Sequence, residues 1–410
     1  MPELTPAASN AGVRTKDWRD TIIVFGSVLA AYVLTMVAFR HFGTSPISYF
    51  NLLARSFIEG HTYLADPPAT VDLAHYQDRW YVPFPPLPAV LMVPVALFSG
   101  ARDVNVGLFM AIAGALAAST VFLIIRGMAN AGLARLTRTD SLVLTAGFAF
   151  GSIAWYMSTT SNVWFVAQVS TYTCTLLGLL GAVSGWPPSI VGAAVALAVT
   201  GRPHAVAIVP LLIAIARSRD RSIGRSWFVA FLAPIACAGA ALAIYNMARF
   251  GNPGDFGYQY ALIDDQFSRD FRTFGQFHVH FLPHNLYAMF LEAPRWTPGL
   301  HFWSPNPDGM SVFATMPFIA WMFKAHSHDK WLPRAAWASL ILGLIPPLLY
   351  YSSGSIQFGP RFWLDVMPAT LFLVILGVRD GLTPWFRAAI ALSIVVNAAG
   401  VVWWHWPRPA

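Results

Sequence analysis

Long runs of apolar residues recur along this 410-residue chain and constrain its fold more than any other feature. Several of them exceed the roughly 18 residues that mark a membrane-spanning helix. Charged residues make up only 11% of the chain, whereas soluble globular proteins contain about 25%. The sequence therefore predicts an all-α, polytopic membrane protein.

Basic residues in the short loops between the apolar runs indicate how the chain is oriented. Arg14, Lys16 and Arg19 precede the first run, and such residues favour the cytoplasmic side of a membrane. We therefore expect a cytoplasmic N-terminal segment at 1–20 and an integral membrane domain at 21–404. The net charge of +7 follows from these loops, so it does not indicate a nucleic-acid partner.

Alternation of the basic loops predicts about eleven membrane spans and a site on the outer face. The run at 85–100 is short and rich in proline, and we expect it to be an interfacial or re-entrant helix. The outer loops would be 41–105, with interfacial helices, and 249–307, followed by a short outer tail at 405–410. The expected spans are 21–39, 106–125, 141–158, 163–184, 189–200, 204–216, 227–248, 309–323, 335–351, 362–377 and 388–404.

Several familiar kinds of site are weakly signalled or absent from the sequence. No phosphate-binding glycine loop, dinucleotide motif or nucleophile elbow occurs. His278 and His280 could bind a metal with Asp264 or Asp265, but no third ligand has diagnostic spacing. A divalent metal is thus possible but not signalled, and no metal ligand is assigned. The terminal WWHW at 403–406 is typical of an aromatic belt at the membrane interface.

Motifs in the first outer loop carry a family resemblance. YFNLLARSFIEGHTYL begins at Tyr49, and DxxxYxxRWYVPFPPLPA begins at Asp72. In this order, followed by TGRPHAV, YNMARFGNPGDFGY and QFGPRFWLDVMP, they resemble segments of bacterial GT-C glycosyltransferases. These are relatives of the protein O-mannosyltransferases and the lipid A aminoarabinose transferase. The resemblance implies a GT-C-like fold and an outward-facing site in the cytoplasmic membrane. That site would transfer a sugar from a polyprenyl-phosphate donor to a glycan, lipid or protein acceptor.

One feature departs from the family pattern. Members usually have an acidic residue, often an Asp-Glu pair, shortly after the first span. Aligned on Leu53-Ala54-Arg55, these positions fall near Pro46 and Ile47, and no carboxylate lies between Thr21 and Glu59. Either another carboxylate has this role, or the chain does not perform the standard reaction.

Aspartates of the first outer loop are the candidate catalytic residues. Glycosyl transfer requires a base for the acceptor hydroxyl and a cation to stabilise the departing phosphate. Asp72 ranks first, since it begins the family-like DxxxYxxRWYVPFPPLPA motif, and Asp66 and Asp78 follow. The alternative is that they are solvated turn residues, because Asp66 precedes two prolines and Asp78 lies in a QDR turn.

Cationic and aromatic residues at the mouths of spans are the candidate substrate-binding residues. Arg202, with His204 beside it, and Arg361 could hold a phosphate through their guanidinium groups. The alternatives are a snorkelling arginine for Arg202 and an ion pair between Arg361 and Asp365, four residues on. We favour the pair as a device that orients Arg361 towards the site.

The other binding candidates are polar or aromatic. Asn162 and Trp164 could form a sugar-stacking platform or part of an aromatic belt. The resemblance adds Arg55, Tyr76 and Arg79. A non-catalytic protein that binds or translocates a polyprenyl lipid remains the main alternative function. A secondary transporter is disfavoured, because no inverted repeat is visible.

Overall fold

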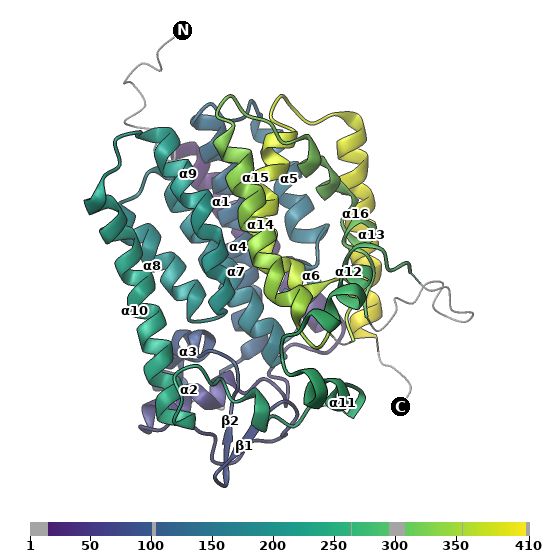
Figure 1. Ribbon diagram of the computed structural model, residues 1–410. Helices are drawn as coiled ribbons and strands as arrows, with labels where there is room; N and C mark the ends of the chain where they lie inside the picture. The colour runs from purple at the N-terminus through teal and green to yellow at the C-terminus, as the bar shows by residue number, and fades with distance from the viewer. Residues whose placement is uncertain (1–14, 101–103, 264, 295–307, 355, 407–410) are drawn as a thin grey trace.

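The computed structural model describes residues 15–100, 104–263, 265–294, 308–354 and 356–406. They form a bundle of helices whose lower end is covered by a smaller cap (Figure 1). The cap consists of residues 40–100, 104, 251–263 and 265–294. Parts of the expected N-terminal segment, second outer loop and C-terminal tail, together with Asp264, lie outside the described residues.

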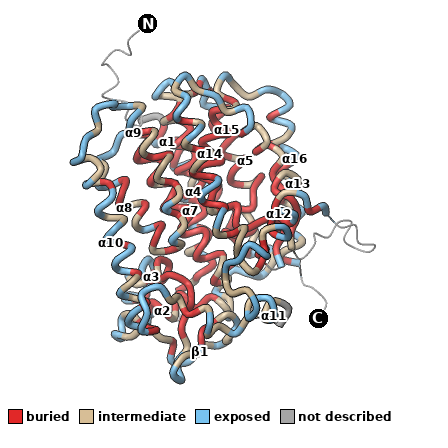
Figure 2. Tube along the Cα trace, in the orientation of Figure 1, coloured by how far each residue is buried: buried red, intermediate tan, exposed pale blue. Residues whose placement is uncertain are grey.

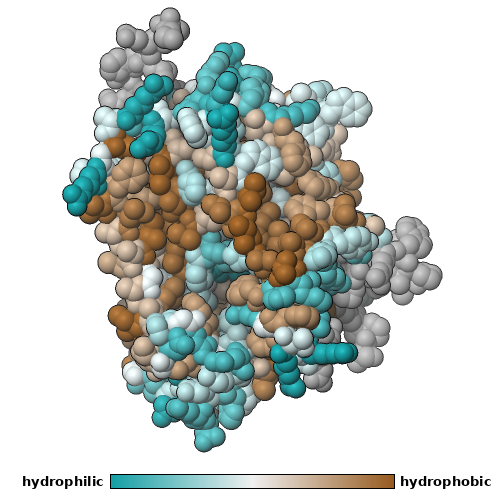
Figure 3. All heavy atoms as spheres, viewed as in Figure 1, coloured by the Kyte–Doolittle hydropathy of each residue, from teal (hydrophilic) through white to brown (hydrophobic). Residues whose placement is uncertain are grey.

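Six helices in the described part of the chain are long and apolar enough to cross a membrane. Figure 3 shows an apolar belt across the middle of the face in view and hydrophilic surfaces at both ends of that face, as expected for a membrane-embedded bundle. The protein is therefore a polytopic, all-α membrane protein. The six helices are α1 (Thr15–Ala38), α4 (Val106–Asn130), α7 (Val163–Ser184), α10 (Arg225–Phe250), α14 (Trp331–Leu349) and α16 (Pro384–His405).

The other five expected spans form shorter or broken helices. Two of them start as 3₁₀ turns close to the cap, one at Pro203 and one directly after Pro360, where proline restricts the backbone. These elements are α5 (Arg138–Phe150), α6 (Ala154–Ser158), α8 (Pro188–Val199), η3 (Pro203–Ile208), α9 (Val209–Arg219), α13 (Val312–Thr315), η6 (Pro317–Lys324), η7 (Arg361–Val366) and α15 (Met367–Gly377).

Helix α7 lies at the centre of the bundle. In its most apolar stretch 89% of the residues are buried, whereas 17% are buried in the corresponding stretch of the peripheral helix α10. Figure 2 shows the same contrast. Small residues allow close helix approach, as is common in membranes. A Cβ on Gly114 of α4 would lie 2.7 Å from the Tyr32 ring of α1. A Cβ on Gly192 of α8 would collide with the carbonyl oxygen of Phe231 in α10.

The cap contains short helices and one β-hairpin that the all-α expectation did not include. Strands β1 (Ala74–Tyr76) and β2 (Arg79–Tyr81) pair antiparallel. Gln77 and Asp78 connect them with φ of 48° and 56°, as in a two-residue type I′ turn. The other cap elements are α2 (Phe50–Ile58), α3 (Leu87–Ser99), η4 (Tyr258–Tyr260), α11 (Asp265–Phe274), η5 (Val279–Phe281) and α12 (Leu282–Phe290).

Candidate functional site

A cavity of about 1820 Å³ lies between the cap and the bundle. Segments far apart in the sequence line it, including 40–47 and 70–72 of the cap, the start of α7, the 201–204 turn, and 345–362. The cavity is large for one sugar, because ligand pockets typically measure about 300–1,000 Å³. Among the described residues that line it, Asp72 is the only carboxylate.

Arg361 is a buried cation in the wall of this cavity, at the start of η7. The residue is only 8% exposed. Its Cζ atom lies 5.0, 5.5 and 5.9 Å from the ring centroids of Phe362, Trp164 and Phe165. Within the described residues, its side chain makes no ion pair with a carboxylate, and Nε has no hydrogen-bond partner. Aromatic faces stabilise a guanidinium, but they do not neutralise its charge.

Arg202, unlike Arg361, has a carboxylate partner in the structure. Arg202 Nε lies 3.0 Å from Oδ1 of Asp365, and His204 Nε2 lies 3.1 Å from Oδ2. The Asp365 side chain is only 2% exposed, so solvent screens its attraction to Arg202 little. Asp365 thus joins η7 to the 202–204 turn and holds Arg202 beside the cavity.

The expected ion pair between Arg361 and Asp365 does not form. The prediction assumed an α-helix, in which residues i and i+4 lie on one face. Residues 361–366 instead form a 3₁₀ helix with three residues per turn. A separation of four residues then places the two side chains about 120° apart, and Asp365 faces Arg202 and His204.

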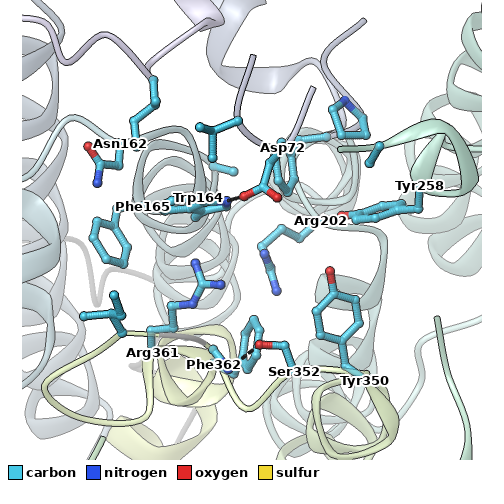
Figure 4. Close-up of a pocket in the computed structure, with 18 of the residues that line it drawn as sticks. Asp72, Asn162, Trp164, Phe165, Arg202, Tyr258, Tyr350, Ser352, Arg361 and Phe362 are labelled. Atoms are coloured by element: carbon cyan, nitrogen blue, oxygen red, sulfur yellow. Dashed lines mark hydrogen bonds between the residues drawn. The ribbon is translucent and has the colours of Figure 1, made fainter. Parts of the chain in front are cut away.

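Asp72 lies on the cap side of the cavity, where its carboxylate accepts a hydrogen bond from Trp164 Nε1 at 2.9 Å. Its backbone has φ of 57°, which aspartate tolerates better than most residues. The Tyr49 hydroxyl donates to the carbonyl oxygen of Val71 at 2.9 Å and fixes the adjoining backbone. Figure 4 shows the Asp72 carboxylate and the guanidinium groups of Arg202 and Arg361 bordering the same space.

Six of the candidate residues are brought together in the cavity wall: Asp72, Asn162, Trp164, Arg202, His204 and Arg361. Their meeting depends on the packing of the cap, α7, the 201–204 turn and η7 around one space. The gathering is the arrangement that a single site for a sugar phosphate would need, since reacting and phosphate-holding groups must reach the same ligand.

The other five candidates do not line the cavity. Asp78 is exposed in the hairpin turn, and Asp66 is exposed on the cap. Arg55 is half-exposed and forms a salt bridge of 2.6 Å with Glu59 on the surface of α2. Arg79 stacks over the Tyr63 ring, and Tyr76 packs on Phe250 and Tyr260. Phe250 is the last residue of α10, so Tyr76 joins the hairpin to the end of that helix.

Several lining residues were not singled out from the sequence. Tyr258 and Tyr350 have ring centroids 6.4 Å apart and face the arginines (Figure 4). Burial raises the pKa of Tyr258, so its hydroxyl remains a hydrogen-bond donor at neutral pH. Tyr258 ends the family-like YNMARFGNPGDFGY stretch, which was the available signal. No sequence signal pointed to Tyr350, because it lies at the end of an apolar run.

The aromatic-belt interpretation of WWHW is wrong for His405. That residue is buried and lines the cavity. Its Nε2 is 3.0 Å from the Thr159 hydroxyl, and its carbonyl oxygen is 3.3 Å from Nε2 of His41. Trp404 also turns inward and packs against Phe165 at 5.3 Å, whereas Trp406 is half-exposed.

The histidine pair that could bind a metal lies in the cap, at the start of η5. No group of three His, Cys, Asp or Glu residues suited to a metal occurs in the described part of the chain. His278 and His280 both stack on Phe274, with ring centroids 5.2 and 4.0 Å away. Asp264 and the side chain of Asp265 lie outside what the structure describes.

The fold and the site define a polytopic helical membrane protein with a cation-lined cavity beneath a cap. Its fold is similar to that of ArnT from Cupriavidus metallidurans, whose crystal structure was determined bound to undecaprenyl phosphate. The TM-score is 0.51 at 13% identity, and the match covers 94% of this chain and 64% of that one. The chain therefore spans just under two thirds of the ArnT chain, and the similarity supports a GT-C-like fold. No model of a known protein family and no curated protein sequence matches.

Proposed function

We propose that this protein is a membrane glycosyltransferase that uses a polyprenyl-phosphate-linked sugar as donor. The acceptor would be a glycan, lipid or protein on the outer face of the cytoplasmic membrane. Arg361 carries the proposal: it is a buried guanidinium with no carboxylate partner among the described residues. A buried charge is costly unless it is paired, and a phosphate supplies two-point hydrogen bonding and the opposite charge.

The size and lining of the cavity support a lipid-linked donor. Aromatic and aliphatic side chains line the cavity together with the two arginines, including Phe165, Ile345, Leu349 and Phe362. Figure 3 shows a hollow in the lower part of the apolar belt, with hydrophilic residues at its base. A polyprenyl chain could lie in the membrane while its phosphate reaches the cavity through such an opening. ArnT, the structural neighbour, was crystallised with a polyprenyl phosphate.

Each charged group then has a role in the transfer. Asp72 accepts the proton of the acceptor hydroxyl as the acceptor oxygen bonds to the anomeric carbon. The bond from that carbon to the phosphate oxygen breaks, and polyprenyl phosphate leaves with the electron pair. Arg361 stabilises the additional negative charge on the phosphate. Arg202, oriented by Asp365, holds the donor from the other side.

Asp72 would also replace the acidic residues usual in the resembled family. Pro46 and Ile47, which align with those residues, line the same cavity as Asp72. The family positions therefore border the space that Asp72 serves, although they contribute no carboxylate. A carboxylate from the next part of the cap can reach that space without any change in the fold.

A transfer assay with matched aspartate variants tests the proposal. Purified protein in lipid nanodiscs would receive radiolabelled polyprenyl-phosphate sugars and a membrane extract as acceptor. Asp72→Asn should lower the initial rate by about 10²–10⁴-fold, the usual contribution of a general base. Asp66→Asn and Asp78→Asn remove the same charge outside the cavity and should retain nearly full activity. Equal activity of all three variants would contradict the assignment of Asp72.

A non-catalytic lipid-binding protein is the second candidate function. The observation that favours it is the apolar pair Pro46 and Ile47 at the expected carboxylate positions. In that case undecaprenyl phosphate would bind saturably and Arg361→Gln would weaken it, yet no donor would give a labelled product. Asp72→Asn would then leave cellular function intact.

A further inference from the structure

The start of α7, whose residues Asn162, Trp164 and Phe165 line the cavity, contains hydrogen-bond donors that have no partner among the described residues. Asn162 occupies the N-cap position with extended φ and ψ of −74° and 144°, yet its side chain makes no capping hydrogen bond. Asparagine at this position normally accepts from the N–H groups of the first turn. The N–H groups of Phe165 and Val166 bond to the Asn162 carbonyl oxygen, whereas that of Trp164 has no partner among the described residues. Both the Asn162 amide and the Trp164 N–H thus remain available.

Arg361 is directed at this same helix end. Figure 4 shows its guanidinium pointing towards Trp164 and Phe165, in the first turn of α7, with Asn162 adjoining. The ring distances of 5.5 and 5.9 Å agree with this placement. The residue is more than nine-tenths buried, and its Nε has no partner among the described residues. A buried cation and an uncapped helix N-terminus therefore face one space, and both favour an anion.

We propose that the phosphate monoester of the ligand binds at the N-terminus of α7, held by Arg361, the Trp164 N–H and the Asn162 side-chain amide. The inference rests on the proposed function, because it locates the phosphate of that function's donor. Arg202 then lies on the sugar side of the phosphate, since Asp365 already balances its charge. The indole of Trp164 separates the phosphate from Asp72 and, through its Nε1, holds that carboxylate.

This arrangement gives a physical reason for an asparagine at position 162. Aspartate would cap α7 as well as asparagine does, but its charge would repel a phosphate. Serine would cap the helix without charge, but it has no amide donor. Asparagine is neutral and can donate through Nδ2, so it can leave the cap position unused and bind an anion.

Binding measurements on isosteric variants test the proposal without any turnover. Wild-type protein, Asn162→Asp, Asn162→Ser and Gln276→Glu would be titrated with undecaprenyl phosphate in nanodiscs. Gln276→Glu is the matched control, because it makes the same amide-to-carboxylate change on another wall of the cavity. Undecaprenol, which lacks the phosphate, and inorganic phosphate separate recognition of the lipid chain from recognition of the anion.

We expect Asn162→Asp to weaken undecaprenyl phosphate binding at least about 10-fold and Gln276→Glu to weaken it less than about 3-fold. Undecaprenol binding should not change. Inorganic phosphate should raise the unfolding temperature of the wild type and not that of Asn162→Asp. Because aspartate is a good N-cap, the unliganded Asn162→Asp variant should be at least as heat-stable as the wild type. Asn162→Ser, which adds no charge, should lose affinity about 3-fold and remains a test if the charged variant folds poorly.

Equal losses in Asn162→Asp and Gln276→Glu would overturn the proposal, since they would reflect the overall charge of the cavity. Unchanged affinity in both Asn162 variants would also overturn it. The proposed glycosyl transfer fails separately from this inference. Phosphate binding that depends on Asn162, without sugar transfer, would retain the anion site and reject the transferase. Sugar transfer with phosphate binding that is insensitive to Asn162 would retain the transferase and reject the anion site.

Discussion

Replacing Asp365 by asparagine tests the role of its carboxylate in holding Arg202. The Asp365 side chain is 2% exposed, and those of Arg202 and His204 are 16% and 17% exposed. The asparagine would keep the shape of the side chain but leave Arg202 as a second, mostly buried cation without a counter-ion, close enough to Arg361 to interact with it electrostatically. Removing one partner of a buried ion pair costs about 3–5 kcal/mol.

The expected change in unfolding temperature follows from the length of the chain. An unfolding entropy of about 2.1 cal/mol/K per residue over 410 residues amounts to about 0.9 kcal/mol/K. The variant should therefore unfold about 3–6 °C below the wild type in a thermal scan in detergent. The same variant should bind undecaprenyl phosphate several-fold more tightly, because the phosphate would neutralise two unpaired guanidinium groups instead of one.

A double variant provides the control for this prediction. Arg202→Met in the Asp365→Asn background removes the unpaired cation, so most of the lost stability should return. Scans would be run at one detergent concentration and one heating rate. The reasoning is refuted if Asp365→Asn unfolds at the wild-type temperature, or if the two substitutions destabilise additively. Weaker phosphate binding by Asp365→Asn would refute the assigned charge balance.

Three further predictions concern other parts of the structure. Trp164→Phe keeps an aromatic ring against Arg361 but loses the 2.9 Å hydrogen bond to Asp72. The transfer rate should therefore fall about 10-fold, while the affinity for undecaprenyl phosphate should be nearly unchanged. A parallel loss of rate and affinity would contradict this prediction. Arg249 is buried and donates hydrogen bonds of 2.7 Å to the Val82 carbonyl oxygen and to Asn246. Arg249→Met should lower the free energy of unfolding by about 1–3 kcal/mol and speed proteolysis in the hairpin. Proteolysis at the wild-type rate would show that other contacts hold the hairpin. Gly192→Ala would force α8 away from the Phe231 carbonyl oxygen and should destabilise the protein by about 1–3 kcal/mol in a thermal scan. Gly26→Ala is the control, because its Cβ would meet no neighbour within 4 Å, and it should not destabilise the protein.

Much of the architecture could be predicted from local sequence. Hydropathy over about 18 residues reports a property of each segment alone, so the helical membrane class is confirmed by the structure. Residues at the mouths of apolar runs, such as Asn162, Trp164, Arg202 and Arg361, were found for the same reason. A polar residue next to an apolar run lies near the end of a helix, and several such ends border the cavity.

The family-like motif ranked Asp72 first among the loop aspartates, but no local pattern could exclude Asp66 and Asp78. Asp66, Asp72 and Asp78 lie within one short loop, yet only Asp72 lines the cavity. The positive φ at Gln77 and Asp78 forms the hairpin turn that carries Asp78 outward. His405 appeared to belong to an interfacial belt, but the packing of α16 beside Thr159 and His41 buries it.

The sequence by itself determined that this chain spans a membrane with helices and keeps its polar groups where those helices end, because hydrophobic transfer free energy depends on composition over a single segment. Only the tertiary structure decided which of those polar groups are partners. Asp365 pairs with Arg202 and His204, from a different segment, and leaves Arg361, four residues away, without a carboxylate among the described residues. Such a choice depends on 3₁₀ geometry and on contacts between distant segments of the chain, which no local pattern encodes.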